Sequence, residues 1–350
     1  MLLDRVFPLG FGIVAGLVIE HFRSKPTESV NVDEEKRETT SIFKYGIPHS
    51  CVSTHAYSGH ALAYDRSKKI PVWVAERITK ENLHGKNADR ENSKFRPDPA
   101  LPVVFSATNA DYWDSGWSRG HMAPAGNYKH SQESMNDTFY LTNILPQDID
   151  NNAGYWNRFE NFCRDLALRY DEVSIISGPA FPVQQSTDGK KFVHYDVIGE
   201  NNVAVPSHLY KLVLAESDTK PPIIGAFVVP NKPLRDEELS QFKVSLEQLE
   251  AMTGIIFHSK LDRSKARTNC GRREWKKSYA LDLCETQGCK LLSHDEFSRW
   301  FYTKRIRGAR KLADVERAWK ELTKKGIEPD EQLIKAYATR KQELGVPRTS

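Results

Sequence analysis

The stretch SRGHMAPAGN occupies residues 118–127 and places an arginine and a histidine two residues apart among glycines and prolines. It has no apolar pattern at helical spacing, and Gly120 and Pro124 are typical of turns and loops. A histidine in a loop can face a groove, and its ordinary pKa near neutrality suits proton transfer. We therefore interpret residues 118–127 as an active-site loop with His121 as its candidate base.

Three polar clusters follow, at residues 143–147, 150–152 and 156–160, in a region otherwise apolar enough to form core. The apolar residues from Trp156 to Tyr170 recur at helical spacing, which predicts a helix over residues 153–170. Glu160 lies two turns after Asn152 and Arg164 one turn later, so all three side chains can face one side. Each also has a purely structural interpretation, as a cap or as an i, i+4 ion pair.

Together these motifs resemble the DNA/RNA non-specific endonucleases, which have a ββα-metal active site. The likeness spans roughly residues 50–260 and is to the endonuclease G branch. It is strongest to the exonuclease G-like mitochondrial nucleases, which carry serine where other relatives carry aspartate before Arg-Gly-His. A weaker likeness runs from Cys284 to about Leu344, where exonuclease G-like proteins have a C-terminal extension. The resemblance implies an α+β fold, with a ββα-metal nuclease core and a small helical C-terminal appendage.

Phosphodiester hydrolysis needs an activated water, positive charge around the phosphate and help for the departing oxygen, and the resemblance assigns residues to these tasks. The catalytic residues it implies are His121, Arg119, Glu160 and Asn143. Asn152 is the implied ligand of Mg²⁺, with Mn²⁺ as an alternative, since Mg²⁺ needs few protein oxygens. The expected substrate contacts are Arg90, Lys129, Arg164, Phe297 and Lys304. Phe297 and the neighbouring aromatic residues have helical core as their ordinary interpretation.

The function that these assignments predict is metal-dependent, sequence-non-specific cleavage of DNA and RNA to 5′-phosphate and 3′-hydroxyl ends. One Mg²⁺ and a histidine base are expected, with 5′-exonuclease as well as endonuclease activity on single strands. Three alternatives stay open. They are an endonuclease G-like enzyme without exonuclease preference, a catalytically silent nucleic-acid-binding protein, and a membrane-tethered interaction protein.

Strand patterns fill much of the remaining core. Residues 61–64 and 71–75 predict paired strands, and the β-branched runs at 173–177, 203–214 and 223–229 predict a mostly antiparallel sheet. Beyond Cys284 the pattern becomes helical. The expected organisation is an N-terminal targeting or anchor segment at 1–25, a linker at 26–46, the nuclease domain at 47–283 and a basic helical domain at 284–345.

The net charge is only +4, but it is unevenly distributed along 350 residues. Residues 304–350 hold 13 Lys and Arg against 7 Asp and Glu, and residues 260–277 hold 8 against 2. Such segments suit a polyanion, although a solvated basic face remains the alternative. The 5 cysteines include no C-x-x-C pair, so a disulfide framework is not expected, and we interpret them as ordinary reduced or locally paired thiols. A zinc site built from Cys270, Cys284, Cys289 and His294 fits no standard spacing.

Residues 6–19 form an uncharged run near the N-terminus. At about 1.5 Å per residue its helical length falls short of a hydrocarbon core of about 30 Å, so presequence, signal peptide and anchor remain open. The family likeness implies a mitochondrial address, in the inner membrane or the intermembrane space. It also implies a homodimer that acts on nucleic acid, and inner-membrane anchoring through residues 6–19 is part of this expectation.

Overall fold

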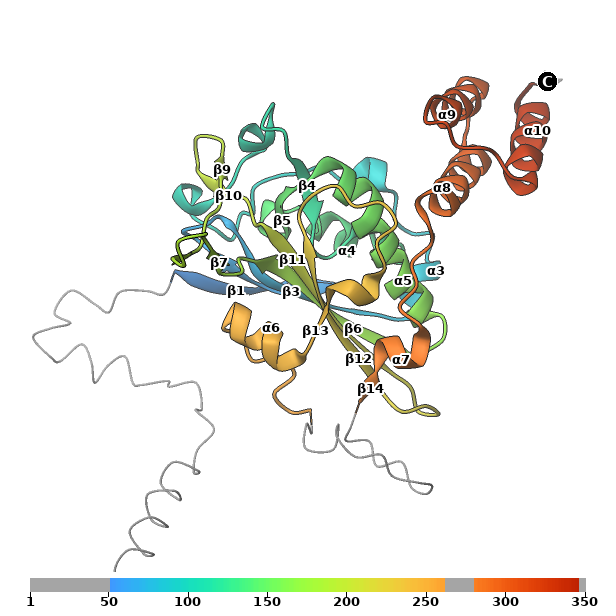
Figure 1. Cartoon of the computed structure of the whole chain (residues 1–350). Coiled ribbons are helices and arrows are strands. Elements are labelled where there is room, and N and C mark those ends of the chain that lie inside the picture. The colour runs from blue at the N-terminus through green and yellow to red at the C-terminus, as the bar shows by residue number, and fades with distance from the viewer. Residues whose placement is uncertain (1–50, 262–279, 346–350) are drawn as a thin grey trace, which may run out of the picture. The chain divides into compact units, whose positions relative to one another are not determined.

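A computed structural model describes residues 51–261 and 280–345. All of them belong to one unit that begins at Cys51. Its centre is a sheet in the order β1-β2-β3-β6-β11-β12-β13, antiparallel throughout, to which β14 adds a parallel edge beside β12 (Figure 1). The sheet strands are β1 (Val52–Ala56), β2 (His60–Asp65), β3 (Ile70–Ile78), β6 (Glu172–Ala180), β11 (His208–Glu216), β12 (Ile223–Pro230), β13 (Lys243–Val244) and β14 (Leu281–Asp282). The predicted antiparallel sheet is confirmed.

Three small ribbons accompany the sheet. They are β4 (Ser118–His121) with β5 (Ile144–Gln147), β7 (Gln184–Gln185) with β8 (Lys191–Phe192), and β9 (Val197–Ile198) with β10 (Val203–Ala204). The expected loop at residue 118 was therefore wrong in part, because its first four residues pair with β5 as a strand. The predicted run at 203–214 is also split, since Pro206 separates β10 from β11.

The helices of the described residues fall into two groups. In the first part of the chain they are α3 (Lys80–His84), α4 (Gln132–Asp137), α5 (Asn157–Ala167) and α6 (Leu246–Thr253), and after residue 280 they are α7 (Leu283–Gln287), α8 (His294–Gly308), α9 (Leu312–Lys324) and α10 (Glu331–Gly345). Capping boxes at Ser245 and Ser293, each with a Gln or Glu three residues later, begin α6 and α8. A π-helical segment, η7 (Asn151–Trp156), precedes α5.

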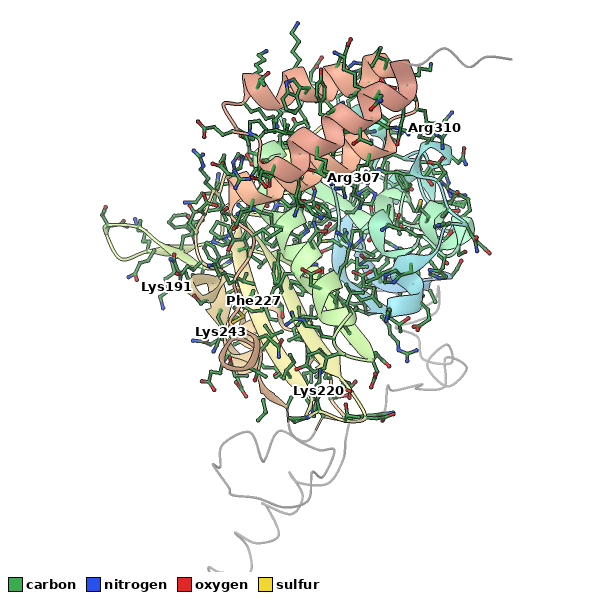
Figure 2. All side chains as sticks on the ribbon, turned by 90° about the vertical axis from the view of Figure 1, so that its right-hand side faces the viewer. Lys191, Lys220, Phe227, Lys243, Arg307 and Arg310 are labelled. Atoms are coloured by element: carbon green, nitrogen blue, oxygen red, sulfur yellow. A yellow bond between two sulfur atoms is a disulfide. The ribbon has the colours of Figure 1, made fainter. Side chains whose placement is uncertain are left out.

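Both faces of the sheet are covered, and strand alternation explains how. On β11, Leu209 and Val213 join the core that packs under α5, whereas Tyr210 and Leu212 join a second cluster under α6. Figure 1 shows α5 and α6 on opposite sides of the sheet. Phe159 of α5 meets Phe227 of β12 (labelled in Figure 2) edge to face, with ring centroids 5.2 Å apart. This packing fixes the helix from which the site is built.

The C-terminal helices α8, α9 and α10 bury a separate small core, which includes Ile306, Val315, Leu322 and Leu333. Arg307 and Arg310, at the end of α8, are exposed (Figure 2). Cys284 and Cys289 form a disulfide between α7 and the segment leading to α8. Both cysteines belong to the four-residue zinc site considered above, and in the disulfide they are not available as zinc ligands. The described residues contain no cluster of three or more metal-binding His, Cys, Asp or Glu side chains.

No helix within the described ranges is long and apolar enough to cross a membrane. The uncharged run at residues 6–19 and Cys270 lie outside those ranges, as does most of the basic segment 260–277.

Candidate active site

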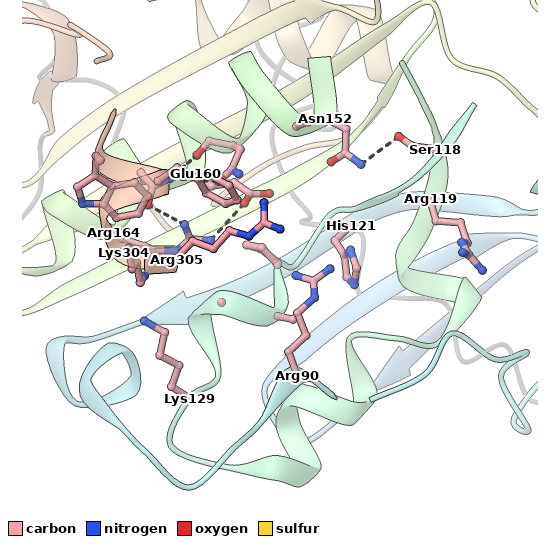
Figure 3. Close-up of a pocket in the computed structure, with 18 of the residues that line it drawn as sticks. Arg90, Ser118, Arg119, His121, Lys129, Asn152, Glu160, Arg164, Lys304 and Arg305 are labelled. Carbon is pink, nitrogen blue, oxygen red and sulfur yellow. Dashed lines mark hydrogen bonds and ion pairs between the residues drawn. The ribbon is translucent and has the colours of Figure 1, made fainter. Parts of the chain in front are cut away.

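Eight of the ten residues singled out from the sequence line one open pocket of about 620 Å³. They come from five places in the chain: Arg90, Arg119, His121, Lys129, Asn152, Glu160, Arg164 and Lys304. Figure 3 shows them around a common space. Asn143 and Phe297 are not part of this lining.

His121 stands at the end of β4, and its ring packs against those of Phe95 and Phe139, with centroids 5.1 and 5.0 Å away. Burial is the main cause that lowers its pKa to about 3, and the charges of Arg90 and Arg119 contribute to that shift. Among the described residues nothing hydrogen-bonds its Nε2. The imidazole is therefore neutral at physiological pH, with one ring nitrogen uncommitted.

Gly120 is required by the close packing of β4 against β5. A Cβ there would lie 2.2 Å from Oε1 of Gln147, on the strand paired with β4. The glycine therefore permits the strand that carries His121 to approach its partner strand closely.

Asn143 is fully buried and acts on the backbone next to His121. Its Oδ1 accepts from the amide of Ala123 at 2.9 Å, and its Nδ2 donates to the carbonyls of Ala123 and Thr138 at 3.0 and 2.8 Å. With its donors and acceptor engaged in this way, Asn143 holds the segment that follows the histidine.

Asn152 projects from the π-helical segment η7, which the sequence pattern did not predict. The preceding Asn151 is fully buried and donates to the carbonyls of Pro230 and Lys232, while Asn152 lines the pocket. Asn152 donates from Nδ2 to Oγ of Ser118 at 3.0 Å. Its carboxamide oxygen is thereby turned away from Ser118 and towards the pocket (Figure 3).

Ser118 itself is anchored, because its hydroxyl donates to the carbonyl of Gln147 at 2.7 Å. The sequence placed this serine beside the histidine motif but assigned it no role. Its contact with Asn152 joins residues 34 positions apart, and no local pattern encodes such a pairing.

Glu160 and Arg164 form the i, i+4 ion pair that was the structural interpretation, at 3.2 Å, and both also line the pocket. Burial raises the pKa of Glu160, although the charges of Arg164 and Lys211 oppose that shift. Arg164 further donates to Oδ1 of Asn127 at 2.7 Å and to Oδ1 of Asn161 at 3.0 Å. Its guanidinium is thus held in one orientation at the pocket wall.

A buried polar layer supports this wall from below. Asn127 donates to Oε2 of Glu76 at 3.0 Å, and the hydroxyl of Tyr128 donates to the same oxygen at 2.9 Å. Burial raises the pKa of Glu76, and the buried Lys211 works against that shift. The sequence did not predict this layer, because Glu76 and Lys211 lie in or next to runs whose residue pattern indicates only ordinary strands of a sheet.

Cationic side chains surround the rest of the pocket. Burial lowers the pKa of Lys129 and that of Lys304, and the repulsion of neighbouring cations adds to both effects. Arg119 lies over the ring of Phe95, 4.3 Å from its centroid, and donates to Oδ1 of Asn109 at 2.7 Å. Cations held close together in this way form an anion-binding surface.

Helix α8 contributes the opposite rim. Trp300 and Phe301, 42% and 41% exposed, line the pocket together with Lys304 and Arg305. Phe297 is only 5% exposed and stacks on Trp300 with centroids 5.5 Å apart. The aromatic side chains that reach the pocket are therefore those of the next helical turn, because Phe297 points into the packing beneath them.

Known proteins show the same arrangement of motifs. The sequence profile of a family described as DNA/RNA non-specific endonuclease matches residues 38–264, and that of the endo/exonuclease (EXOG) C-terminal domain matches residues 292–340. The chain belongs to the DNA/RNA non-specific endonuclease family. It is accordingly a nuclease, a hydrolase of phosphodiester bonds.

Relatives of this family match over nearly the whole chain. Mitochondrial nuclease EXOG of Mus musculus is 44% identical over 342 residues, covering 96% of this chain and 88% of the mouse protein. The protein of the same name from Homo sapiens is 43% identical over 350 residues, covering 95% and 91%. The family resemblance inferred from the residue 118–127 motif is thus confirmed.

The fold is confirmed as well. A chain in the crystal structure of an EndoG/EndoGI complex superposes with a TM-score of 0.59 at 36% identity, over 63% of this chain and 91% of that one. The chain therefore has the ββα-metal nuclease fold of endonuclease G, with helices added at its C-terminal end.

Proposed function

We propose that this nuclease cleaves DNA and RNA without sequence specificity, in a metal-dependent reaction that leaves 5′-phosphate and 3′-hydroxyl ends. The observation that carries the proposal is that a neutral histidine and a free carboxamide oxygen, His121 and Asn152, line one pocket among cations. Phosphodiester hydrolysis needs those three features at once.

The donors at the pocket suit a hard divalent cation. Asn152 offers a neutral oxygen, and the Glu160 carboxylate lies on the same side of the pocket wall to orient water around the ion. We propose that Asn152 is the protein ligand of Mg²⁺, with Mn²⁺ as a substitute. A bound ion there would supply positive charge to the phosphate and to the departing 3′ oxygen.

His121 is the proposed general base, which takes a proton from the attacking water at a ring nitrogen. Its lowered pKa keeps it unprotonated and ready to accept. Arg90 and Arg119, whose charges lower that pKa, are the proposed clamps on the phosphate oxygens, together with Lys129 and Arg164. Neutralisation of these arginines by a bound phosphate would raise the basicity of the imidazole as substrate arrives.

We further propose that α8 biases the enzyme towards single strands and 5′ ends, giving exonuclease as well as endonuclease activity. The support is that Trp300, Phe301 and Lys304 close one rim of the pocket with stacking surfaces and positive charge. The matched EXOG C-terminal domain includes this helix.

The test compares 5′-labelled linear single-stranded DNA with covalently closed single-stranded circles, using the wild type and a Trp300→Ala/Lys304→Ala variant. The expected result is Mg²⁺-dependent cleavage of both substrates by the wild type, with short 5′-phosphorylated products from linear DNA. The variant should lose the preference for the linear form. Equal rates on both forms would support the endonuclease alternative, and binding without cleavage would support a silent nucleic-acid-binding protein.

A mitochondrial, homodimeric enzyme anchored to the inner membrane through residues 6–19 completes the proposal. Its support is the names of the mouse and human relatives, which are mitochondrial nucleases, together with the uncharged N-terminal run. Carbonate extraction of purified mitochondria should leave the full chain in the membrane pellet and release a chain lacking residues 1–25. Sedimentation should report a mass of two chains.

A further inference from the structure

A second pocket adjoins the proposed active site and shares part of its wall. Its volume is about 640 Å³, within the range of about 300–1,000 Å³ that ligand pockets occupy. Arg90, Ser118 and Arg119 line both pockets, so the two pockets meet at these side chains. In Figure 3, Arg119 lies on the far side of His121 from Lys304 and Arg305, so the substrate path can continue past the histidine away from α8.

The wall of this second pocket is aromatic. Phe95, Tyr112, Trp113 and Trp117 contribute rings to it, and Asn109 contributes an amide that accepts from Arg119. Its shared cations are Arg90 and Arg119, and Arg119 is already stacked over the ring of Phe95. Rings edged by guanidinium groups are a surface for a flat heterocycle, whereas the first pocket, with its lysines and arginines, is a surface for phosphate.

Trp113 is the exposed member, with 83% of its surface open to solvent. It stands in a turn in which Asp114 and Gly116 have positive φ of 51° and 80°. That turn is anchored at its base, because Asp111 accepts from the backbone and side chain of Asn201 at 3.0 and 3.0 Å. Trp113 lines the same pocket as Phe95, Tyr112 and Trp117, so its exposed ring is placed to stack on a flat ligand that enters there.

We propose that this second pocket is a nucleobase subsite, in which Trp113 stacks on a base of the strand whose scissile phosphate lies at His121. The inference rests on the proposed function of the first pocket and extends it. Because a base must leave its pair to enter, the subsite favours single-stranded over duplex substrate. Stacking accepts any base, which agrees with cleavage that ignores sequence.

The test uses the full chain, an oligothymidylate, the same oligonucleotide with one abasic residue placed in turn on either side of the cleaved bond, and bis(p-nitrophenyl) phosphate. Trp113→Ala should lower the ratio of kcat/KM on the oligonucleotide to that on the small diester by about 10-fold, mainly through KM. Trp113→Phe should recover most of that ratio. When the abasic residue takes the place of the base that stacks on Trp113, the wild type and Trp113→Ala should have the same ratio of kcat/KM on the two substrates.

The matched control is Phe192→Ala, an exposed aromatic residue on β8 that lines neither pocket and should leave the ratio at the wild-type value. An unchanged ratio for Trp113→Ala, or a shift from dimer to monomer with no change in KM, would overturn the subsite. Failure of the wild type to hydrolyse either substrate would instead overturn the proposed function, so the two failures are distinguishable.

Discussion

The two sides of the pocket are built differently. On the sheet side, His121 is buried, Asn143 braces the chain that follows it, and Arg164 makes three hydrogen bonds to neighbouring side chains. On the α8 side, Lys304 is exposed and Trp300 is 42% exposed, on helices that have a small core of their own. The difference indicates that the groups proposed to carry the chemistry are held by the main core, while the groups proposed to select the substrate stand on a more open surface.

The largest expected effect is at the centre of the sheet side. His121→Ala should lower kcat by about 10³-fold, because it removes the proton acceptor, and leave the affinity for single-stranded DNA within about 2-fold. Steady-state cleavage assays measure kcat, and fluorescence anisotropy measures the affinity for single-stranded DNA. The control is His194→Ala, at an exposed histidine in the segment between β8 and β9, and it should behave as wild type. Turnover near the wild-type rate would remove the histidine from the mechanism.

The buried layer beneath the wall should matter for both stability and chemistry. Glu76→Gln takes the negative charge away from the buried Lys211 and from Asn127, so the free energy of unfolding should fall by about 3 kcal/mol. The cleavage rate should fall as well, because Asn127 orients Arg164. Arg305→Ala, which breaks the ion pair with Glu321 in the helical part, should cost at most about 1 kcal/mol. Denaturant titration of both variants measures their free energies of unfolding. Equal losses of stability in the two variants would contradict this prediction.

An Asn152 variant tests the proposed Mg²⁺ ligand. Asn152→Ala should raise the Mg²⁺ concentration needed for half-maximal rate by about 10- to 100-fold, as loss of a ligand does. Ser118→Ala removes the hydrogen bonds of the serine hydroxyl to Asn152 and Gln147 but leaves the Asn152 oxygen in place, so it should raise that Mg²⁺ concentration by less. The cleavage rate of both variants is measured as a function of Mg²⁺ concentration. An unchanged Mg²⁺ requirement in Asn152→Ala would refute the ligand assignment.

Substitutions on the α8 side should change substrate affinity and its salt dependence rather than kcat. Lys304→Ala should raise KM a few-fold and reduce the slope of log affinity against log salt by about 1, because one phosphate contact is lost. Lys320→Ala removes a lysine of α9 that does not line the pocket and should leave the slope unchanged. A drop in kcat equal to that of a catalytic variant would show that α8 takes part in the chemistry itself.

The smallest expected effect is on pH dependence. In the free enzyme the pKa of His121 is about 3, and the charges of Arg90 and Arg119 help to lower it. A bound phosphate neutralises those charges, so the pKa should be higher in the complex than in the free enzyme. The acid limb of kcat should therefore lie at higher pH than that of kcat/KM, and coinciding limbs would contradict the proposed coupling.

Much of the fold could be predicted from local patterns. The antiparallel pairing of β2 with β3, the helix containing Glu160 and the capping boxes of α6 and α8 all follow from periodicity and from caps a few residues apart. The π-helical start of α5 and the strand at Ser118 did not follow. Both depend on partners elsewhere, such as the carbonyls that hold Asn151 and the β5 strand beside β4.

The sequence by itself determined the family, the composition of the site and the positions of its motifs, because these are carried by residue types and short spacings. Only the tertiary structure decided which side chains share a pocket, why Asn152 has a free oxygen, and how Glu76 comes to support Arg164 through Asn127. The physical reason is distance along the chain. The contact between Glu76 of β3 and Asn127, 51 residues apart, forms only when the segment after β4 packs against the sheet, and burial then sets the pKa values of the groups enclosed there.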